Sequence, residues 1–172
     1  MIALVIGGSG SGKSQFAEDM CKGKSPLTYI ATMKPCGSEA EERIKRHRKM
    51  RKDKGFTTLE CCSNLHTLNL RGTVLLECMS NLLANEIFDE GLSPNKATDK
   101  IMSGVNKLFS NCENTVIVTN DIFSYSESYS PQLEEYISAL GRINREIAQK
   151  ADIVVEVVAG IPIYHKGGSY DN

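Results

Sequence analysis

The sequence predicts an α/β fold with a mostly parallel central sheet and helices on both of its faces. Apolar, β-branched runs recur along the chain, helical patterns lie between them, and the first run leads directly into a glycine-rich turn. The runs are nearly continuous, which is typical of strands that are covered on both faces of a parallel sheet. Strands that alternate with helices favour right-handed crossovers within one sheet.

Five apolar runs are the predicted strands of this sheet. They are Ile2–Ile6, Leu27–Ala31, Thr73–Leu76, Thr115–Thr119 and Ile153–Val158, of which Leu27–Ala31 is the weakest. The stretch AGIPIYHK near the end of the chain adds one short edge strand. Its glycine suits a turn, and its proline cannot donate a hydrogen bond inside a ladder, so it suits an edge.

The clearest helical pattern spans Pro131–Lys150, where apolar residues recur at the spacing of one helix face. The longest polar break is DEGLSPNKATD, residues 89–99, and we predict a loop between helices there. We expect residues 1–166 to form a single domain. The tail GGSYDN, residues 167–172, is expected to be disordered.

Length and composition are those of an ordinary soluble globular protein. The 172 residues can bury a real core, and their formal net charge of −1 does not favour a nucleic-acid-binding domain. No apolar stretch approaches the roughly 20 residues needed to span a bilayer, and the N-terminus lacks the charged region of a signal peptide. We therefore expect a cytoplasmic protein without a membrane span. Its six scattered cysteines are then reduced thiols.

The turn after the first strand, GGSGSGKS, matches the pattern G-x-x-x-x-G-K-[ST]. Its glycines let consecutive backbone N–H groups point at phosphate oxygens, and the following helix adds its positive N-terminal end. The lysine reaches the β- and γ-phosphates, and the last serine binds Mg²⁺. The fold is therefore predicted to be P-loop NTPase-like, with a nucleotide-binding loop of Gly7, Gly8, Ser9, Gly10, Ser11, Gly12, Lys13 and Ser14.

A P-loop needs a second acid for its magnesium ion, normally at the end of a neighbouring strand. Glu77 ends the apolar run in TVLLECMSN, and Asp121 follows Asn120 after the run in TVIVTND. Either carboxylate could instead be a helix cap or a solvated residue. We favour Glu77 for the metal or nucleotide and keep Asp121 as the rival.

The stretch RIKRHRKMRKDK, residues 43–54, places His47 among eight basic residues. Ser38 and Glu41 form a capping box and Gly55 suits the far end, so a stable exposed helix explains the charge pattern without any function. On such a helix Arg43, His47 and Arg51 share one face. Neighbouring cations keep the imidazole neutral and nucleophilic, and arginines bind phosphate oxygens. From spacing alone, His47 is either a plain surface histidine or a nucleophile that attacks phosphorus.

These motifs together resemble the bifunctional adenosylcobinamide kinase/adenosylcobinamide-phosphate guanylyltransferase family of cobalamin biosynthesis. The resemblance runs from Met1 to about Lys166. The matching pieces stand in order as GGSGSGKS, YIAT, RIKRHRKMR, TTLE, LLECMSNLLANEIF, VIVTND and LGRINREIAQKADIVVEVVAGIPI. The pattern R-I-x-x-H-x-x-x-R after Y-I-A-T and the closing pattern G-R-x-N-R-x-I-A are much more specific than the P-loop.

The resemblance implies that the chain phosphorylates adenosylcobinamide and then transfers GMP from GTP to the resulting phosphate through a guanylylated histidine, His47. Lys13 and His47 are then the catalytic residues, and Ser14 and Glu77 hold Mg²⁺. Further nucleotide contacts are implied at Ala31, Thr32, Met33, Arg48, Lys49, Met50, Arg51, Glu60 and Glu77. The family implies ATP, GTP and Mg²⁺ as cofactors, a corrinoid as the partner molecule, and assembly as a homo-oligomer, with a trimer as the expected state.

Two other functions remain open from the sequence. The chain could be a P-loop small-molecule kinase without guanylyltransferase activity, in which His47 is incidental. It could also be a P-loop ATPase or switch that docks nucleic acid through its basic helix. The near-zero net charge and the few aromatic residues around the basic stretch argue against nucleic acid.

Overall fold

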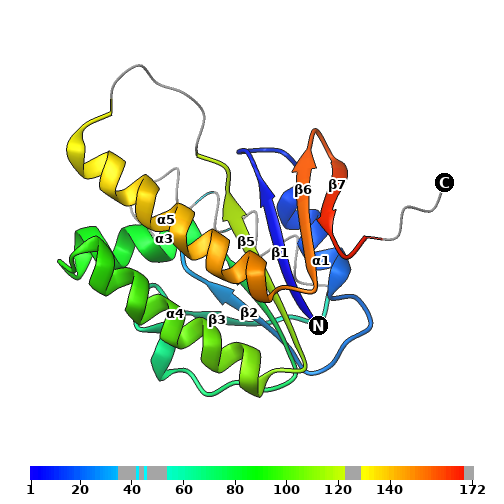
Figure 1. The fold of residues 1–172 in the computed structure, drawn as a ribbon. Helices are drawn as coiled ribbons and strands as arrows, with labels where there is room; N and C mark the ends of the chain where they lie inside the picture. The colour runs from blue at the N-terminus through cyan, green and yellow to red at the C-terminus, as the bar shows by residue number, and fades with distance from the viewer. Residues whose placement is uncertain (35–41, 43–44, 46–53, 123–128, 169–172) are drawn as a thin grey trace.

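A computed structural model describes residues 1–34, 42, 45, 54–122 and 129–168 of the chain (Figure 1). Most of the predicted helix between Ser38 and Gly55 therefore lies outside the described residues. Glu42 and Lys45, which are described, are both helical and exposed. The predicted disordered tail lies outside the described residues from Ser169 onward.

The described residues form a seven-stranded sheet in the order β3-β2-β4-β5-β1-β6-β7. Every neighbouring pair is parallel except β6 and β7, which pair antiparallel at one edge. The strands are β1 Ile2–Gly7, β2 Leu27–Ala31, β3 Thr57–Glu60, β4 Thr73–Glu77, β5 Asn114–Asn120, β6 Ile153–Val158 and β7 Ile161–Lys166. The five predicted strands and the predicted edge strand are thus confirmed.

Helices cover both faces of the sheet, as predicted (Figure 1). Helix α1, Lys13–Met20, packs on one face, and α3, α4 and α5 pack on the other. Their bounds are Met79–Ala84, Pro94–Asn111 and Pro131–Lys150. A π-helix, Asn85–Asp89, extends α3, and a 3₁₀ turn, Leu65–Thr67, packs near α4. Helix α5 has the bounds predicted from its apolar spacing.

Successive side chains of the central strands point to opposite faces, and both sets are buried. In β1, Leu4 joins the core under α3, α4 and α5, whereas Ala3 and Val5 join the core under α1. In β5, Ile117 lies in the first core and Val116 in the second. This two-sided burial is why the strands are nearly continuous apolar runs.

The prediction of a loop at residues 89–99 is wrong for residues 94–99, because α4 begins at Pro94. Ser93 has extended backbone angles and Pro94 stands at the first helical position, where a missing N–H group costs nothing. The Ser-Pro pair therefore starts a helix instead of breaking one. Strand β3 was not predicted, because three of its four residues are exposed and the segment lacks an apolar run.

The order of the strands fixes where a ligand can bind. The chain moves from β1 through α1 toward β2 on one side, and from β5 through α5 to β6 on the other side of β1. The two helices also lie on opposite faces of the sheet. In open α/β sheets, ligands bind outside the carboxyl ends of the strands at such a switch point. The turn after β1 lies at this place.

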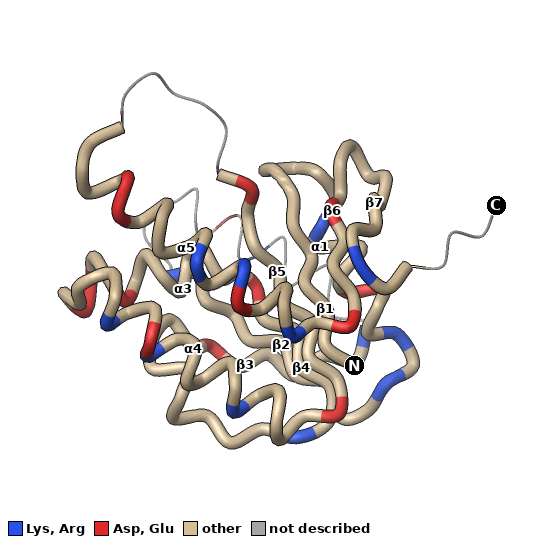
Figure 2. Tube along the Cα trace, viewed as in Figure 1, with Lys and Arg blue, Asp and Glu red and all other residues tan. Residues whose placement is uncertain are grey.

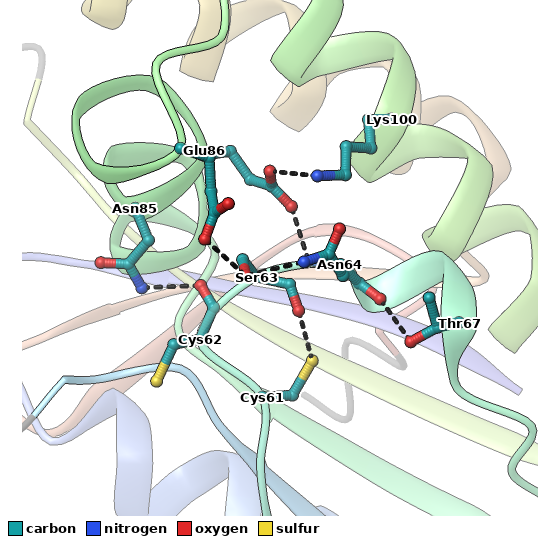
Figure 3. A network of polar contacts seen from close by, with 9 residues as sticks. Cys61, Cys62, Ser63, Asn64, Thr67, Asn85, Glu86 and Lys100 are labelled. Atoms are coloured by element: carbon teal, nitrogen blue, oxygen red, sulfur yellow. Dashed lines mark hydrogen bonds and ion pairs between the residues drawn. The ribbon is translucent and has the colours of Figure 1, made fainter.

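A polar network joins the loop after β3 to the π-helix and α4 (Figure 3). The fully buried Glu86 carboxylate accepts a hydrogen bond from the Asn64 backbone N–H at 2.7 Å and pairs with Lys100 Nζ at 2.7 Å. The Lys100 side chain keeps 24% of its surface exposed. A buried carboxylate without its cation is costly, so this pair ties α4 to the loop.

Lys100→Met is expected to lower the free energy of unfolding by about 3 kcal/mol, because it leaves the buried Glu86 carboxylate without its cation. The matched control is Lys96→Met, one turn earlier on α4 and exposed, which should change stability by less than about 0.5 kcal/mol. Urea unfolding followed by circular dichroism measures both. Adding Glu86→Gln to Lys100→Met should restore most of the loss, and equal effects of the two lysine variants would contradict this account.

Candidate functional site

The turn between β1 and α1 has the backbone that a phosphate-binding loop requires. A side chain at Gly7 would place its Cβ 2.5 Å from Ser11 Oγ and 2.7 Å from the Val157 carbonyl oxygen, so this position accepts only glycine. Gly12 has φ +92°, a left-handed conformation that side chains rarely adopt. The Gly160 N–H, from the turn after β6, donates to the Ser11 carbonyl at 2.8 Å and holds the loop.

Lys13 and Ser14 begin α1 directly after this loop. Lys13 keeps only 8% of its surface exposed, and its Nζ donates to the Gly8 carbonyl at 3.0 Å, so its charge lies over the loop. The positive end of the helix and the lysine together favour an anion. The loop of Gly7 to Ser14 therefore has the geometry and the charge to hold phosphate.

Glu77 lies against the start of α1, at the end of β4. Ser14 Oγ donates to Glu77 Oε1 at 2.5 Å, and the buried Tyr29 donates from Oη to Glu77 Oε2 at 3.0 Å. A hydroxyl and a carboxylate are oxygen ligands of the kind that Mg²⁺ prefers. The residues present therefore suit the predicted magnesium site of Ser14 and Glu77.

Asp121, the rival acid, lies one residue beyond β5 and is exposed. Its backbone N–H donates to the Gly7 carbonyl at 3.1 Å, which places it beside the first glycine of the loop. Strand β5 lies between β1 and β4, so both acids border the loop. The Ser14 hydroxyl contacts Glu77, and this geometry favours Glu77 as the metal-side acid.

Three of the predicted nucleotide contacts lie side by side at the carboxyl edge of the sheet. Ala31 is in register with Glu60 on β3 and with Glu77 on β4. Met33, two residues beyond β2, is half-buried. The parallel register therefore brings together Ala31 and Glu77, which are 46 positions apart in the sequence (77 − 31).

Thr32 is fully buried, and its hydrogen bonds are internal. Its Oγ1 donates to the Cys78 carbonyl at 2.8 Å and accepts from the Cys78 N–H at 2.7 Å, while its own N–H donates to the Glu77 carbonyl at 3.0 Å. Its carbonyl accepts from Asn85 Nδ2 at 2.9 Å. Thr32 thus holds the backbone of Glu77 and Cys78, and Asn85 also holds the Cys62 carbonyl, as Figure 3 shows.

Two polar residues at this edge were missed by sequence reasoning as parts of the site. Tyr29 contacts Glu77, and Asn120 ends β5 and donates from Nδ2 to Ser80 Oγ at 2.8 Å. Asn120 stands at the last position of an apolar run, and that position was a usable signal. Tyr29 lies within an apolar run, so the sequence gave no signal for it.

Burial raises the pKa of the Cys78 thiol, so this cysteine next to Glu77 is protonated at neutral pH and is not a nucleophile.

The predicted residues of the basic stretch, His47, Arg48, Lys49, Met50 and Arg51, lie outside the described residues. The end of that stretch is described: Lys54 Nζ contacts Glu18 Oε2 at 2.5 Å and Gln15 Oε1 at 3.0 Å. Glu18 and Gln15 belong to α1, the helix that follows the phosphate-binding loop. Lys54 therefore fixes the end of the basic stretch to that helix.

Charges of both signs are interspersed along α4 and α5 (Figure 2). Arg142, for example, pairs with Asp99 at 3.2 Å and with Glu146 at 3.0 Å. These two helices therefore do not offer the continuous basic face on which nucleic acid would dock. None of the helices in the described ranges has the length and apolar character required to cross a membrane.

Comparison with known proteins agrees with the resemblance seen in the sequence. The model of the CobU family, described as cobinamide kinase / cobinamide phosphate guanyltransferase, matches residues 3–164. Over 181 residues the chain is 31% identical to the bifunctional adenosylcobalamin biosynthesis protein CobU of Escherichia coli (strain K12), covering 95% of this chain and 98% of that protein. It is 29% identical over 182 residues to the protein of the same name from Salmonella typhimurium, with the same coverage of both chains.

Among solved structures, the chain is similar to an ATPase from the type III secretion system of pathogenic bacteria, with 10% identity and a TM-score of 0.48. It is also similar to the P4 protein of bacteriophage phi6 in complex with ADP, with 12% identity and a TM-score of 0.44. The matches cover 90% and 94% of this chain but about half of each of those chains. The fold assignment therefore rests on the sheet order and the loop after β1.

Glu77→Gln is expected to raise the Mg²⁺ concentration needed for triphosphate binding by about 10- to 100-fold, because it removes the charge beside the Ser14 hydroxyl and keeps the shape. Asp121→Asn is the matched control and should leave this concentration within about twofold of wild type, because the Ser14 hydroxyl contacts Glu77. Titration calorimetry with a nucleoside triphosphate at a series of Mg²⁺ concentrations measures both. The opposite ranking of the two variants would assign the metal to Asp121.

Proposed function

Because the chain belongs to the cobinamide kinase / cobinamide phosphate guanyltransferase family, we propose that it carries out both reactions in cobalamin biosynthesis. It phosphorylates the hydroxyl of the adenosylcobinamide side chain and then transfers GMP from GTP to that phosphate. The products are adenosylcobinamide-GDP and pyrophosphate. The observation that carries the kinase step is the phosphate-binding loop with Ser14 Oγ held 2.5 Å from Glu77 Oε1.

In the kinase step, the substrate hydroxyl oxygen forms a bond to the γ-phosphorus of ATP or GTP, the bond from that phosphorus to the nucleoside diphosphate breaks, and the hydroxyl proton is released. Phosphoryl transfer needs in-line positioning and charge stabilisation more than covalent help from the protein. The backbone N–H groups of the loop position the phosphates, and Lys13 neutralises charge on the β- and γ-oxygens. Ser14 and Glu77 would hold Mg²⁺, which would supply further positive charge to the phosphates when bound.

In the transferase step, an imidazole nitrogen of His47 forms a bond to the α-phosphorus of GTP, and pyrophosphate leaves. A phosphate oxygen of adenosylcobinamide phosphate then forms a bond to the same phosphorus, the phosphorus–nitrogen bond breaks, and His47 is restored. Splitting one displacement into two in this way is nucleophilic catalysis. Arg48, Lys49 and Arg51 supply cations to the phosphates, and Ala31 to Met33 with Glu60 complete the nucleotide contacts.

We propose the cytoplasm as the place of this enzyme and small molecules, not nucleic acid, as its partners. The five described cysteines are free thiols, which suits a reducing compartment. Assembly as a trimer remains a proposal that the resemblance supports. The apolar side chains exposed on the β6–β7 hairpin, Val158, Ile161 and Ile163, offer surface that an oligomer could bury.

Lys13→Ala is expected to lower the kcat/KM of adenosylcobinamide phosphorylation by about 10²–10³-fold, because the reaction loses a cation at the transferring phosphoryl group. Phosphate transfer from radiolabelled ATP or GTP measures it. Lys22→Ala, an exposed lysine beyond the end of α1, is the control and should retain the wild-type rate. An unchanged rate in Lys13→Ala would mean that the loop after β1 does not hold the triphosphate for this reaction.

Incubation with GTP and Mg²⁺ is expected to add one GMP to the chain and to release pyrophosphate, and intact mass spectrometry measures the adduct. A phosphorus–nitrogen bond to imidazole is labile in acid and stable in base, unlike a serine ester. His47→Ala should abolish the adduct and retain part of the kinase activity, because the phosphate-binding loop needs no covalent intermediate.

The controls for this adduct are His66→Ala and His165→Ala, which should leave it intact. His165 pairs with Glu156 at 3.1 Å, and His66 lies in the 3₁₀ turn near α4. Arg51→Ala should slow adduct formation by about 10²–10³-fold, as expected for loss of one charge that stabilises the transition state. Wild-type protein that binds GTP but forms no adduct would leave a kinase without guanylyltransferase activity.

A further inference from the structure

The proposed kinase step releases the proton of the acceptor hydroxyl, and a group beside the phosphate-binding loop has to take it. Protein kinases place an aspartate carboxylate at this point. Such a general base must lie within hydrogen-bond reach of the hydroxyl, either directly or through one water. The position of each acid relative to the loop therefore decides which of them can serve.

The strand order ranks the acids at the carboxyl edge of the sheet by their distance from the loop after β1. Neighbouring strands lie about 4.8 Å apart. Asp121 follows β5, which pairs directly with β1, whereas Glu77 ends β4 and Glu60 ends β3, both of which lie further along the sheet. The Asp121 backbone N–H also donates to the Gly7 carbonyl at 3.1 Å. On this side of β1, Asp121 is thus the described acid closest to the start of the loop.

Glu156 lies on β6, the other neighbour of β1, but further from the loop along the strand direction. It is in register with Ile6, whereas Asn120 is in register with Gly7. Asp121 follows Asn120, so it stands two positions nearer the loop than Glu156. At about 3.3 Å per residue this difference is roughly 6.6 Å, which exceeds the reach of one hydrogen bond. Asp121 therefore borders the loop itself.

The contacts of Glu77 and Glu156 give these two acids other roles. Glu77 accepts from Ser14 Oγ at 2.5 Å and from Tyr29 Oη at 3.0 Å, which keeps its carboxylate at the predicted metal side. Glu156 pairs with His165 Nε2 at 3.1 Å and so joins β6 to the edge strand β7. Position and contacts together leave the side of the loop next to β5 to Asp121.

The surface beside Asp121 has room for part of an acceptor molecule. A hollow of about 390 Å³ lies there, lined among the described residues by Ile6, Asp121, Gly141, Asn144, Arg145 and Glu156. This volume falls within the roughly 300–1,000 Å³ of small-molecule sites. Asp121 is exposed, so a hydroxyl that enters the hollow has access to its carboxylate. The hollow lies on the α5 side of the sheet, whereas α1 covers the opposite face.

We propose that Asp121 is the general base of the kinase step. The acceptor hydroxyl oxygen forms its bond to the γ-phosphorus while the bond from that phosphorus to the nucleoside diphosphate breaks. The hydroxyl proton passes to a carboxylate oxygen of Asp121 and from there to solvent. The proposal rests on the proposed function and adds to it a catalytic residue that is neither in the phosphate-binding loop nor at the metal side.

The test is Asp121→Asn in the full chain, which keeps the shape of the side chain and removes the base. The kcat of adenosylcobinamide phosphorylation is expected to fall about 10²–10⁴-fold, the usual contribution of a general base. The KM of adenosylcobinamide should stay within about threefold, because the loss falls on the chemical step. The Kd of MgATP from titration calorimetry should stay within about twofold, because the loop and Glu77 are unchanged. Asp121→Glu keeps a carboxylate and should recover part of the rate.

The matched control is Glu146→Gln, which makes the same change of carboxylate to amide on α5, where Glu146 pairs with Arg142 at 3.0 Å. It should leave the kcat within about twofold of wild type.

A wild-type kcat in Asp121→Asn would overturn the proposal, and so would a raised KM with an unchanged kcat, which would make Asp121 a binding residue. A raised Kd of MgATP in Asp121→Asn would also overturn it, because the residue would then serve the nucleotide or its metal. Loss of the rate in Glu156→Gln in place of Asp121→Asn would assign the base to Glu156. If the wild-type chain does not phosphorylate adenosylcobinamide, the proposed function itself fails, an outcome distinct from these.

Discussion

Burial of the central strands on both faces is the constraint on which the rest of this structure depends. Leu4, Leu76 and Ile117 contact one core, while Val5, Leu75 and Val118 contact the other, so neither face of the sheet is open to a polar ligand. Polar side chains can meet only where the strands end. The carboxyl ends of the parallel strands all lie at one edge, and there the chain places the glycine-rich loop, Glu77 and Asn120.

At that edge, the positions of the site residues are fixed mainly by backbone groups and buried side chains. Thr32 bonds to both backbone groups of Cys78 and to the Glu77 carbonyl, and Asn85 bonds to the Thr32 carbonyl in turn. The pair of the buried Glu86 carboxylate and the partly exposed Lys100 secures the neighbouring loop to α4. A carboxylate held by packed, hydrogen-bonded neighbours needs less reorganisation when charge develops beside it. This network, of which Figure 3 draws Asn85, Glu86 and Lys100, thus fixes the backbone next to the predicted nucleotide contacts.

The sequence was sufficient to predict features that depend on local pattern. The parallel strands follow from continuous apolar runs, α5 follows from its apolar spacing, and the loop after β1 follows from the spacing of glycine and lysine. Features that depend on long-range register were not predicted. Strand β3 carries exposed residues and forms because its backbone pairs with β2. The hydrogen bond from Tyr29 to Glu77 joins β2 to β4, and Tyr29 gave no signal because it lies inside an apolar run. The start of α4 at Pro94 was hidden because proline and serine favour both turns and helix starts.

Two buried asparagines differ in how their side-chain amides are paired. Asn85 keeps 9% of its surface exposed and Asn144 keeps 8%, so both side chains have lost their contact with water to the same extent. Asn85 donates to two backbone carbonyls and stabilises the segment after β2, whereas the Asn144 amide has no hydrogen-bond partner among the residues that the structure describes. An amide that satisfies its neighbours contributes to stability, but an amide that remains unpaired lowers stability.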